Sequence, residues 1–179
     1  MKYWKTEIST ITAAFLLAVP HGAFAGGIGE IDSSGWSTDP AAYGMTVEEF
    51  IQAESRAFIG NFSDRVGVNN WFHFPGLSDK DDTWVVSPNN DTVYSLAAVN
   101  VSEGFELVMP DVGKDRFLSI HIIDENHMSP FYLYGGGKRT FTADQFGTDF
   151  VAIGIRMGTD GTAEDVKYII DTLQSQYQI

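Results

Sequence analysis

Two histidines and two carboxylates crowd the stretch HIIDENH, which carries His121, Asp124, Glu125 and His127 at the end of a predicted strand. Imidazole and carboxylate groups are ligands of Zn²⁺, Mn²⁺ and Fe²⁺, and they also act as acids and bases in catalysis. The spacing matches neither a zinc signature nor a helical pair. Three interpretations stay open: a divalent-metal site formed by His121, Asp124 and His127, a metal-free site, or a histidine bonded to a backbone carbonyl beside an acidic loop.

The stretch SPNNDTVYS is also polar and leads into another predicted strand. Asn and Asp bond to nearby backbone groups, so the stretch could simply redirect the chain at a structural corner. It could also supply a catalytic site, in which Asp91 orients or ligates, His121 acts as base and Tyr94 donates to a developing oxyanion. Asn89 and Asn90 are then ligand-binding candidates. This hypothesis requires the two polar stretches to meet in space.

Three arginines are candidates for charged contacts. Arginine binds carboxylates bidentately, so Arg116 and Arg139 could contact a ligand in a pocket, and Arg116 is the ligand-binding candidate. The alternative for both is a salt bridge to one of the many acidic residues of the chain. Arg156 lies in a strand that looks buried, so we expect it to pair internally with Asp91 or Asp124.

The remaining candidates are aromatic residues or lie next to them in the sequence. In PFYLY, Tyr132 and Tyr134 alternate with apolar residues, so one face of that strand presents two hydroxyl groups. Such a face could stack a sugar ring or face a dimer partner. His73 lies between Phe72 and Phe74, and this arrangement favours a packing role for the imidazole.

Two helices are expected to flank the elements that position these residues. Thr46 and Glu49 form a capping box at the start of the first helix, and Gly60 stands where its C-cap belongs. A last helix begins at Thr162, and Asp165 completes its cap. The first helix has one apolar side that we expect to pack on a sheet. This side consists of Val47, Phe50, Ile51, Phe58 and Ile59.

Between the helices, short apolar or alternating runs are separated by turn residues, which is typical of antiparallel β structure. The predicted strands span 83–87, 92–101, 104–109, 115–123, 130–134 and 150–157. The fold class is therefore α+β, with a mainly antiparallel β core, sandwich or barrel-like, flanked by an N-terminal and a C-terminal helix.

The N-terminus predicts export. Residues 1–25 have the form of a signal peptide, with Lys2 and Lys5, then an apolar stretch, then the small-x-small site Ala23-Phe24-Ala25. The alternative is an amphipathic helix kept in the mature protein. Residues 26–44 are predicted to be an extended arm, and residues 45–179 a single β-rich domain. We expect a periplasmic or secreted protein.

Composition narrows the function classes. The chain has no cysteine, which excludes thiolate nucleophiles, thiolate metal ligands and redox motifs. A net charge of −13 argues against nucleic acid and anionic membrane surfaces as partners. No stretch after the signal is long enough to span a membrane, so no membrane insertion is expected after cleavage. The glycine-rich YGGGKRTF could cradle a phosphate, but it lacks the strand-to-helix context of known phosphate loops.

Several motifs together resemble the bacterial family known as domain of unknown function 1254. PNNDTVYS is close to its hallmark PN-x-DT-x-YS, and NNWFHF resembles its N-x-[FW]-x-H element. SEGFELVMPDVGKDRFLSIHIID resembles its apolar strand, P-D-x-x-x-R-[FY] turn and following strand. IRMGTDGTAEDVKYIIDTLQSQY resembles its R-x-x-x-x-G-x-x-D element and a closing helix that ends in Q-x-x-Y.

The resemblance covers residues 70–177 and implies a β-rich fold and export, without a general activity. The second domain of longer members does not follow here, so a site shared between the two domains would be incomplete. Two functions stay open. One is an exported enzyme that acts on a small or carbohydrate-like substrate by acid/base or metal-assisted chemistry. The other is a non-catalytic periplasmic ligand-binding or protein-interaction module. A homo-oligomer is compatible with either.

Overall fold

The computed structural model describes Gly35, residues 37–79 and residues 88–179. Ser37–Ser78 and Asn89–Ile179 form one compact unit, to which the following description is confined. The predicted signal peptide at 1–25 and the predicted strand at 83–87 lie outside the described residues. Within the part of the predicted arm that is described, Pro40–Tyr43 forms a short 3₁₀ helix, η1, capped by the side chain of Asp39.

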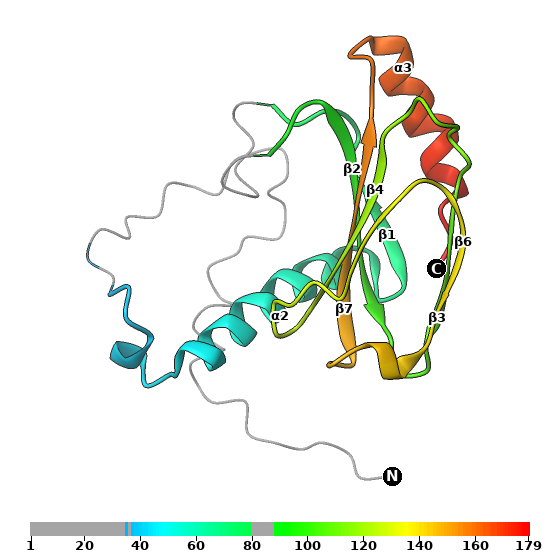
Figure 1. Ribbon diagram of the computed structural model, residues 1–179. Helices are drawn as coiled ribbons and strands as arrows, with labels where there is room; N and C mark the ends of the chain where they lie inside the picture. Colours follow the sequence, from blue (N-terminus) through cyan, green and yellow to red (C-terminus); the bar gives the residue numbers. More distant parts are fainter. Residues whose placement is uncertain (1–34, 36, 80–87) are drawn as a thin grey trace. The chain divides into compact units, whose positions relative to one another are not determined.

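The main sheet has five antiparallel strands in the order β1-β2-β7-β4-β5 (Figure 1). Their bounds are β1 (Asn70–His73), β2 (Thr92–Asn100), β7 (Phe150–Gly158), β4 (Leu118–Asp124) and β5 (Phe131–Tyr134). Four of these strands were predicted within a few residues. The sequence did not predict β1, because its four residues include no apolar alternation that would distinguish a strand from a packed loop.

A second sheet pairs β3 (Phe105–Met109) with β6 (Gly137–Phe141). The predicted strand at 104–109 is β3, whereas β6 was not predicted. The stretch YGGGKRTF therefore forms the connection from β5 and the strand β6, not a phosphate loop. Its Arg139 donates hydrogen bonds to the backbone carbonyls of Tyr134 and Gly135 at 2.8 and 2.9 Å, which holds the guanidinium inside the protein's own turn.

The hydrophobic core lies between one face of the main sheet and the layer made by β3, β6 and the C-terminal helices. In Figure 1 these elements lie on the opposite side of the sheet from α2 (Val47–Val66). The C-terminal helices are α3 (Ala163–Tyr168), a π-helical turn η3 (Ile169–Leu173) and η4 (Gln174–Gln176). Fully buried core residues include Val93, Leu107, Ile120, Ile153, Ile155 and Ile169.

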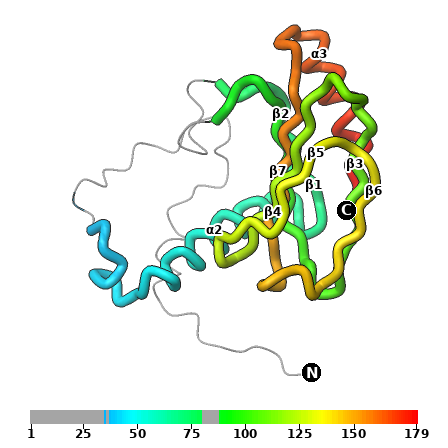
Figure 2. Tube along the Cα trace, viewed as in Figure 1, coloured from blue at the N-terminus to red at the C-terminus, as the bar shows by residue number. Residues whose placement is uncertain are grey.

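Figure 2 traces the end of the chain back to the second sheet, where Gln178 and Val108 exchange two backbone hydrogen bonds of 3.0 and 3.1 Å. The predicted α+β class, with its antiparallel core and two flanking helical ends, is confirmed. Among the described residues, no helix combines the length and apolar character that crossing a membrane requires.

The capping box predicted at the start of α2 is confirmed, since Thr46 and Glu49 exchange both of its hydrogen bonds. The predicted end at Gly60 is wrong, because α2 continues to Val66 and is capped by Gly67. The extra turns bury Phe62. This burial outweighs the roughly 1 kcal/mol cost of a glycine inside a helix.

The predicted apolar side of α2 packs on the sheet only in its second half. Ile59 is buried against Ala98 and Ala152, whose small side chains let the helix approach the sheet. The first half is different from the prediction, because Val47, Phe50 and Ile51 are all exposed. α2 therefore covers only part of the second face of the main sheet.

Candidate functional site

Where α2 does not reach, the second face of the main sheet carries several exposed side chains. We call this surface the open face. Its residues lie on β2, β7, β4 and β5 or beside them, and they are Tyr94, Phe117, Ser119, His121, Tyr132, Tyr134 and Arg156. The exposed fractions of Phe117, Tyr132 and Tyr134 are 46%, 43% and 64%, so three large rings remain accessible to solvent.

Arg156 lies at the centre of the open face. The strand register places Tyr94, Arg156, Ser119 and Tyr134 side by side across four neighbouring strands. The Arg156 guanidinium lies 5.6 Å from the centre of the Tyr94 ring, in a cation–π contact. The side chain is exposed, although β7 is the central strand of the sheet.

Sequence reasoning missed the exposure of Arg156, although β7 carries a signal for it. Residues on one face of β7 are large and apolar, whereas the other face alternates Ala152, Gly154, Arg156 and Gly158. The small residues on both sides of Arg156, Gly154 and Gly158, leave space beside its side chain. Gly158 also allows close packing, since a Cβ atom there would lie 3.0 Å from the Cβ of Phe117. The predicted internal pairing of Arg156 with Asp91 or Asp124 is wrong.

Other arginines have polar partners. Arg56 pairs with Glu125, and Arg116 pairs with Asp165. Arg139 donates to backbone carbonyls as described above. Among the described residues, by contrast, no carboxylate or other hydrogen-bond acceptor contacts the Arg156 guanidinium.

Beside Arg156, the hydroxyl group of Ser119 is buried and has no hydrogen-bond partner among the described residues. A buried polar group without a partner costs free energy, so its presence calls for an explanation. The row formed by Arg156 and Ser119 thus presents a guanidinium and an unused hydroxyl on the same face.

His121 occupies the next row, beside Tyr132, with ring centres 5.0 Å apart. Its Nε2 atom lies 2.8 Å from the hydroxyl of Ser129. Burial lowers the pKa of His121, and the positive charge of Arg156 lowers it further. The imidazole is therefore neutral at pH 7, and Arg156 carries the positive charge of the open face.

The predicted metal-ligand set of His121, Asp124 and His127 is not assembled. Asp124 lies on the core face of β4, opposite His121, and its Oδ1 accepts hydrogen bonds from the backbone N–H groups of Asn126 and Met128. His127 lies in the loop, with Nδ1 3.0 Å from the Ser55 hydroxyl. Nowhere in the described part of the chain do three or more His, Asp or Glu side chains come together in a metal-binding arrangement.

The loop residues of HIIDENH instead fasten α2 to the sheet. Glu125 accepts a hydrogen bond from Arg56 at 3.0 Å, and Asn126 accepts one from Gln52 at 2.9 Å. His127 completes the row through its contact with Ser55. Three consecutive loop residues therefore contact one side of the helix.

The predicted catalytic cluster of Asp91, Tyr94 and His121 is not formed either. The register separates Asp91 from His121 by two strands and five residues, or roughly 20 Å, which excludes a direct hydrogen bond. The Tyr94 hydroxyl accepts a hydrogen bond from the backbone N–H of Asn89 at 3.0 Å. The ring of Tyr94 lies on the open face, whereas its hydroxyl is bonded to the turn before β2.

The structural corner predicted for SPNNDTVYS is confirmed. Oδ1 of Asn89 accepts a hydrogen bond from the backbone N–H of Asp91 at 2.7 Å, which is an Asx-turn. Asn90 and Asp91 are exposed on the outside of this turn. The polar residues therefore direct the chain into β2.

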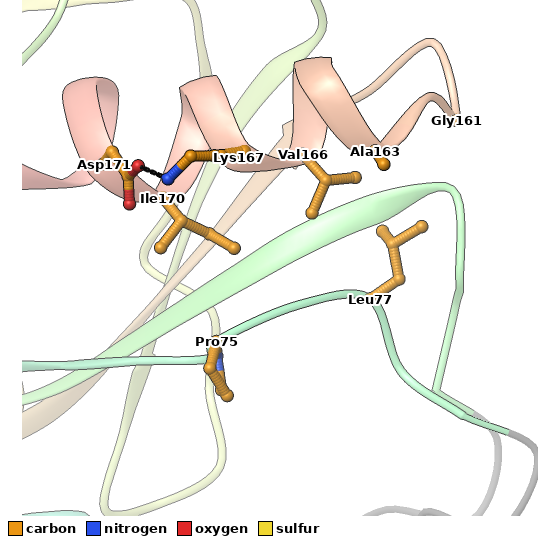
Figure 3. Close-up of a pocket in the computed structure, with 8 residues that line it drawn as sticks. All are labelled: Pro75, Leu77, Gly161, Ala163, Val166, Lys167, Ile170 and Asp171. Carbon is orange, nitrogen blue, oxygen red and sulfur yellow. Dashed lines mark hydrogen bonds and ion pairs between the residues drawn. The ribbon is translucent and has the colours of Figure 1, made fainter.

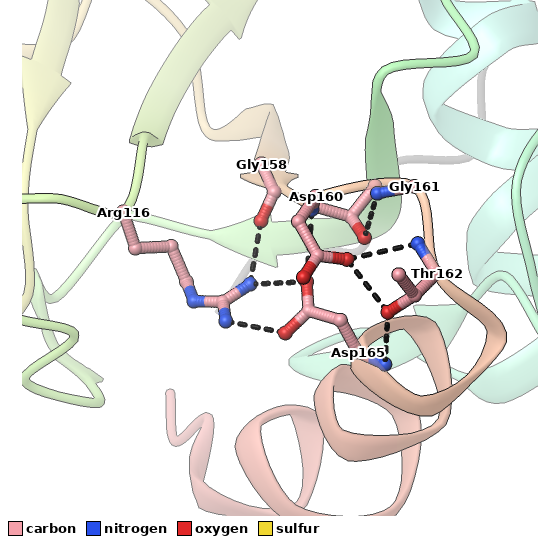
Figure 4. A network of polar contacts seen from close by, with 7 residues as sticks. Arg116, Gly158, Asp160, Gly161, Thr162 and Asp165 are labelled. Carbon is pink, nitrogen blue, oxygen red and sulfur yellow. Dashed lines mark hydrogen bonds and ion pairs between the residues drawn. The ribbon is translucent and has the colours of Figure 1, made fainter.

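Arg116 forms an ion pair with Asp165 and does not lie on the open face. Its two terminal nitrogens donate to the two carboxylate oxygens at 2.9 and 2.5 Å, and one of them also donates to the carbonyl of Gly158 at 2.7 Å (Figure 4). The guanidinium holds the pKa of Asp165 well below its usual range. The salt-bridge alternative is thus the one that the structure bears out.

A second polar group of residues lies on the core face at the β1 edge of the sheet. We call it the edge cluster, and it consists of Trp71, His73, Ser95, Gln174 and Tyr177. Nδ1 of His73 lies 2.8 Å from the Ser95 hydroxyl, which accepts a hydrogen bond from Gln174 at 3.2 Å. The rings of Trp71 and Tyr177 both pack on His73, with centres 6.3 and 5.4 Å from it.

Two hydrogen-bonding groups of the edge cluster have no partner among the described residues. They are Nε1 of Trp71 and the hydroxyl of Tyr177, and both atoms are buried. Burial raises the pKa of Tyr177 and lowers that of His73. Sequence reasoning assigned only packing to His73, because the partners from β2 and the C-terminal helices are far away in the chain.

A groove of about 540 Å³ lies between the segment after β1 and the C-terminal helices (Figure 3). Pro75 and Leu77 form one wall, and Val166 and Ile170 lie on the other. Pro75 follows His73 by two residues and Ile170 precedes Gln174 by four. Both walls are therefore continuous along the chain with segments that carry the edge cluster.

The protein is thus an α+β protein whose antiparallel sheet leaves part of one face open. Residues 68–141 match the family described as Protein of unknown function (DUF1254), which confirms the family resemblance for the motifs within that range. The three motif segments that contain His73, Ser95 and Gln174 meet in the edge cluster.

The fold is similar to the crystal structure of the VPA0106 protein from Vibrio parahaemolyticus. The TM-score is 0.55 and the sequence identity 16%, over 72% of this chain and 35% of that chain. The chain thus spans about a third of the length of that protein, and the likeness shows the fold alone. No curated protein matches the chain.

Proposed function

We propose that this protein is a non-catalytic ligand-binding module, and that its open face binds a sugar-like molecule carrying a carboxylate. The observation that carries the proposal is the position of Arg156. This arginine is exposed at the centre of the sheet and contacts no carboxylate of the described residues. The chain has 24 acidic and 11 basic residues, yet no carboxylate of the described residues pairs with this guanidinium, which leaves it available to an external anion.

A carboxylate fits the Arg156 guanidinium well, because two parallel N–H donors match its two oxygens. The buried hydroxyl of Ser119 lies in the same row and offers one further hydrogen bond. Since the chain as a whole is strongly acidic, this local positive charge would select the orientation of an anionic ligand more than it would speed association.

The sugar-like part of the ligand is suggested by the rings beside Arg156. Tyr132 and Tyr134 lie with ring centres 5.4 Å apart, and Phe117 lies 6.0 Å from Tyr134. Exposed aromatic rings with polar tips bind molecules that combine an apolar ring face with hydroxyl groups. The neutral imidazole of His121 adds a group that can exchange hydrogen bonds with such hydroxyls.

The enzyme hypothesis receives less support. Acid/base chemistry by His121 and Asp91 would require the two groups to lie close to one reacting atom. The register separates them by roughly 20 Å. The form of residues 1–25 supports export, so we infer that binding takes place in a periplasm or outside the cell. Mass spectrometry of the mature N-terminus tests the expected cleavage after Ala25.

The binding proposal is tested by titrating the protein with D-glucuronate and, separately, with D-glucose, which lacks only the carboxylate. Backbone amide shifts in ¹H–¹⁵N spectra report which residues respond. We expect saturable shifts at β4, β5 and β7 with glucuronate and weaker binding of glucose. Arg156→Gln should lower the glucuronate affinity roughly tenfold or more, because one charge-assisted bidentate contact is lost.

The matched control is Lys114→Gln, which removes the same positive charge from an exposed residue in the turn before β4, outside the strands of the main sheet. It should leave the glucuronate affinity within about twofold of the wild type. Equal losses in the two variants would indicate a general charge effect and would overturn the proposal. So would shifts that map to any surface other than the open face.

A further inference from the structure

The edge cluster is separate from the open face. The direction of the hydrogen bonds within the cluster determines which groups it offers to a ligand. Gln174 donates to the Ser95 hydroxyl oxygen, so the hydroxyl proton is free to be donated to Nδ1 of His73. The neutral imidazole then carries its proton on Nε2. His73 thus offers an N–H donor on the side of the ring away from Ser95.

Two more donors lie on the rings that pack against His73. Nε1 of Trp71 can only donate a hydrogen bond, and the hydroxyl of Tyr177 has no partner that would accept its proton among the described residues. The Trp71 and Tyr177 ring centres are 5.5 Å apart. Tyr177 is only 7% exposed, so its hydroxyl is not satisfied by bulk water.

Two of these donors have no hydrogen-bond partner among the described residues, and the three rings that carry the donors pack on one another. An oxygen atom that accepts several hydrogen bonds would satisfy them. A carboxylate supplies two such oxygens and accepts up to four hydrogen bonds. Part of the cluster is exposed to solvent, because β1 is an edge strand and both Trp71 and His73 are half-buried.

The backbone near Gln174 supports a site rather than simple packing. The five residues before it form the π-helical turn η3, an uncommon conformation that is found frequently at functional sites. In this protein the turn brings Leu173 into the core and Gln174 onto the Ser95 hydroxyl. A regular α-helix would place these two side chains differently around the helix axis.

We propose that the edge cluster is a binding site for a small carboxylate, held by Nε2 of His73, Nε1 of Trp71 and the hydroxyl of Tyr177. Ser95 and Gln174 act as positioning residues, because they fix the tautomer and orientation of His73 without contacting the ligand. The proposal does not depend on the open face, since the two sites lie on opposite faces of the main sheet.

The experiment follows the indole N–H signal of Trp71 in ¹H–¹⁵N spectra of the full-length protein during a titration with sodium acetate at constant ionic strength. Hydrogen bonding moves this signal downfield, so we expect a saturable downfield shift. Tyr177→Phe removes one hydroxyl without changing the ring. It should weaken acetate binding roughly tenfold, as expected for the loss of one hydrogen bond to a charged group.

The matched control is Tyr168→Phe, which removes the hydroxyl of an exposed tyrosine on α3. It should leave the acetate affinity unchanged. Arg156→Gln should also leave it unchanged, and this result separates the edge cluster from the open face. A Trp71 signal that does not move, that moves without saturating, or that responds equally in Tyr177→Phe would overturn the proposal.

Discussion

Asp165 binds Arg116 through both of its carboxylate oxygens, and Arg116 also donates to the carbonyl of Gly158. One end of this contact is in the first turn of α3, and the other is at the end of β7. Around it, Asp160 accepts hydrogen bonds from Thr162, and Asp165 accepts one from the backbone N–H of Asp160, which fixes the turn between the two elements (Figure 4). The ion pair thus connects the C-terminal helices to the main sheet.

Asp165→Asn should lower the free energy of unfolding by about 2 kcal/mol at pH 7, since both groups are largely buried and the pair is bidentate. The pKa of Asp165 is lower in the folded protein than the ordinary value of about 3.9 for an unfolded chain. Its contribution is therefore complete above pH 5 and is lost as the pH falls through 3.9 toward the folded pKa.

Urea unfolding at pH 7 and at pH 3 measures this contribution. The difference between wild type and Asp165→Asn should be smaller at pH 3. The exposed Asp144 provides the control, and Asp144→Asn should change the free energy of unfolding by less than about 0.5 kcal/mol at either pH. A difference for Asp165→Asn that does not depend on pH would contradict the assignment.

A second pH dependence comes from His73. Burial lowers its pKa below the ordinary value of about 6.5, so the unfolded chain binds this proton more readily. The stability contributed by neutral His73 is complete above pH 6.5 and is lost as the pH falls toward the folded pKa. His73→Gln should therefore make the midpoint of urea unfolding less sensitive to pH between 7.5 and 5.

Burial also lowers the pKa of His121, so this residue adds its own pH dependence to the midpoint of urea unfolding. His121→Gln therefore serves as the comparison, and each single variant should remove part of the slope while the double variant removes most of it. A slope that is unchanged in His73→Gln would show that protonation of His73 does not oppose folding.

The parts of the structure that could be predicted are those set by neighbouring residues. The capping box of Thr46 and Glu49 and the turn made by Asn89 both depend on contacts within a few positions. The alternation of side chains that predicts β7 and β4 also involves only neighbouring residues. Such local patterns were enough to predict the α+β class and most strands.

The candidate sites depend on contacts that the sequence does not reveal. Arg156 is exposed because α2 covers the sheet only as far as Ala98 and Ala152, and no local pattern states how far a helix reaches. His73 gains its role from Gln174, which is far away in the chain. His121 and Asp124 were grouped by proximity in sequence, but an odd separation along a strand places them on opposite faces.

The two halves of α2 should respond differently to truncation. Phe62→Ala should lower the free energy of unfolding by about 3–5 kcal/mol, because it removes a ring that is 2% exposed in the core. Phe50→Ala, on the same helix, removes a ring that is 42% exposed and should cost less than about 1 kcal/mol. Chemical denaturation measures both values, and equal costs would mean that the first half of α2 is packed.

Gly136 should tolerate no side chain, because the backbone at this point passes directly against Pro110. A Cβ atom on Gly136 would lie 1.8 Å from the carbonyl oxygen of Pro110, so one of the two backbone segments would have to move. Gly136→Ala should therefore lower the free energy of unfolding by about 3 kcal/mol. At Gly147 the nearest atoms to a new Cβ are at 3.6 and 3.8 Å, so Gly147→Ala should be nearly neutral. Thermal unfolding of the two variants tests the connection between β5 and β6, and a neutral Gly136→Ala would mean that this connection follows a different path.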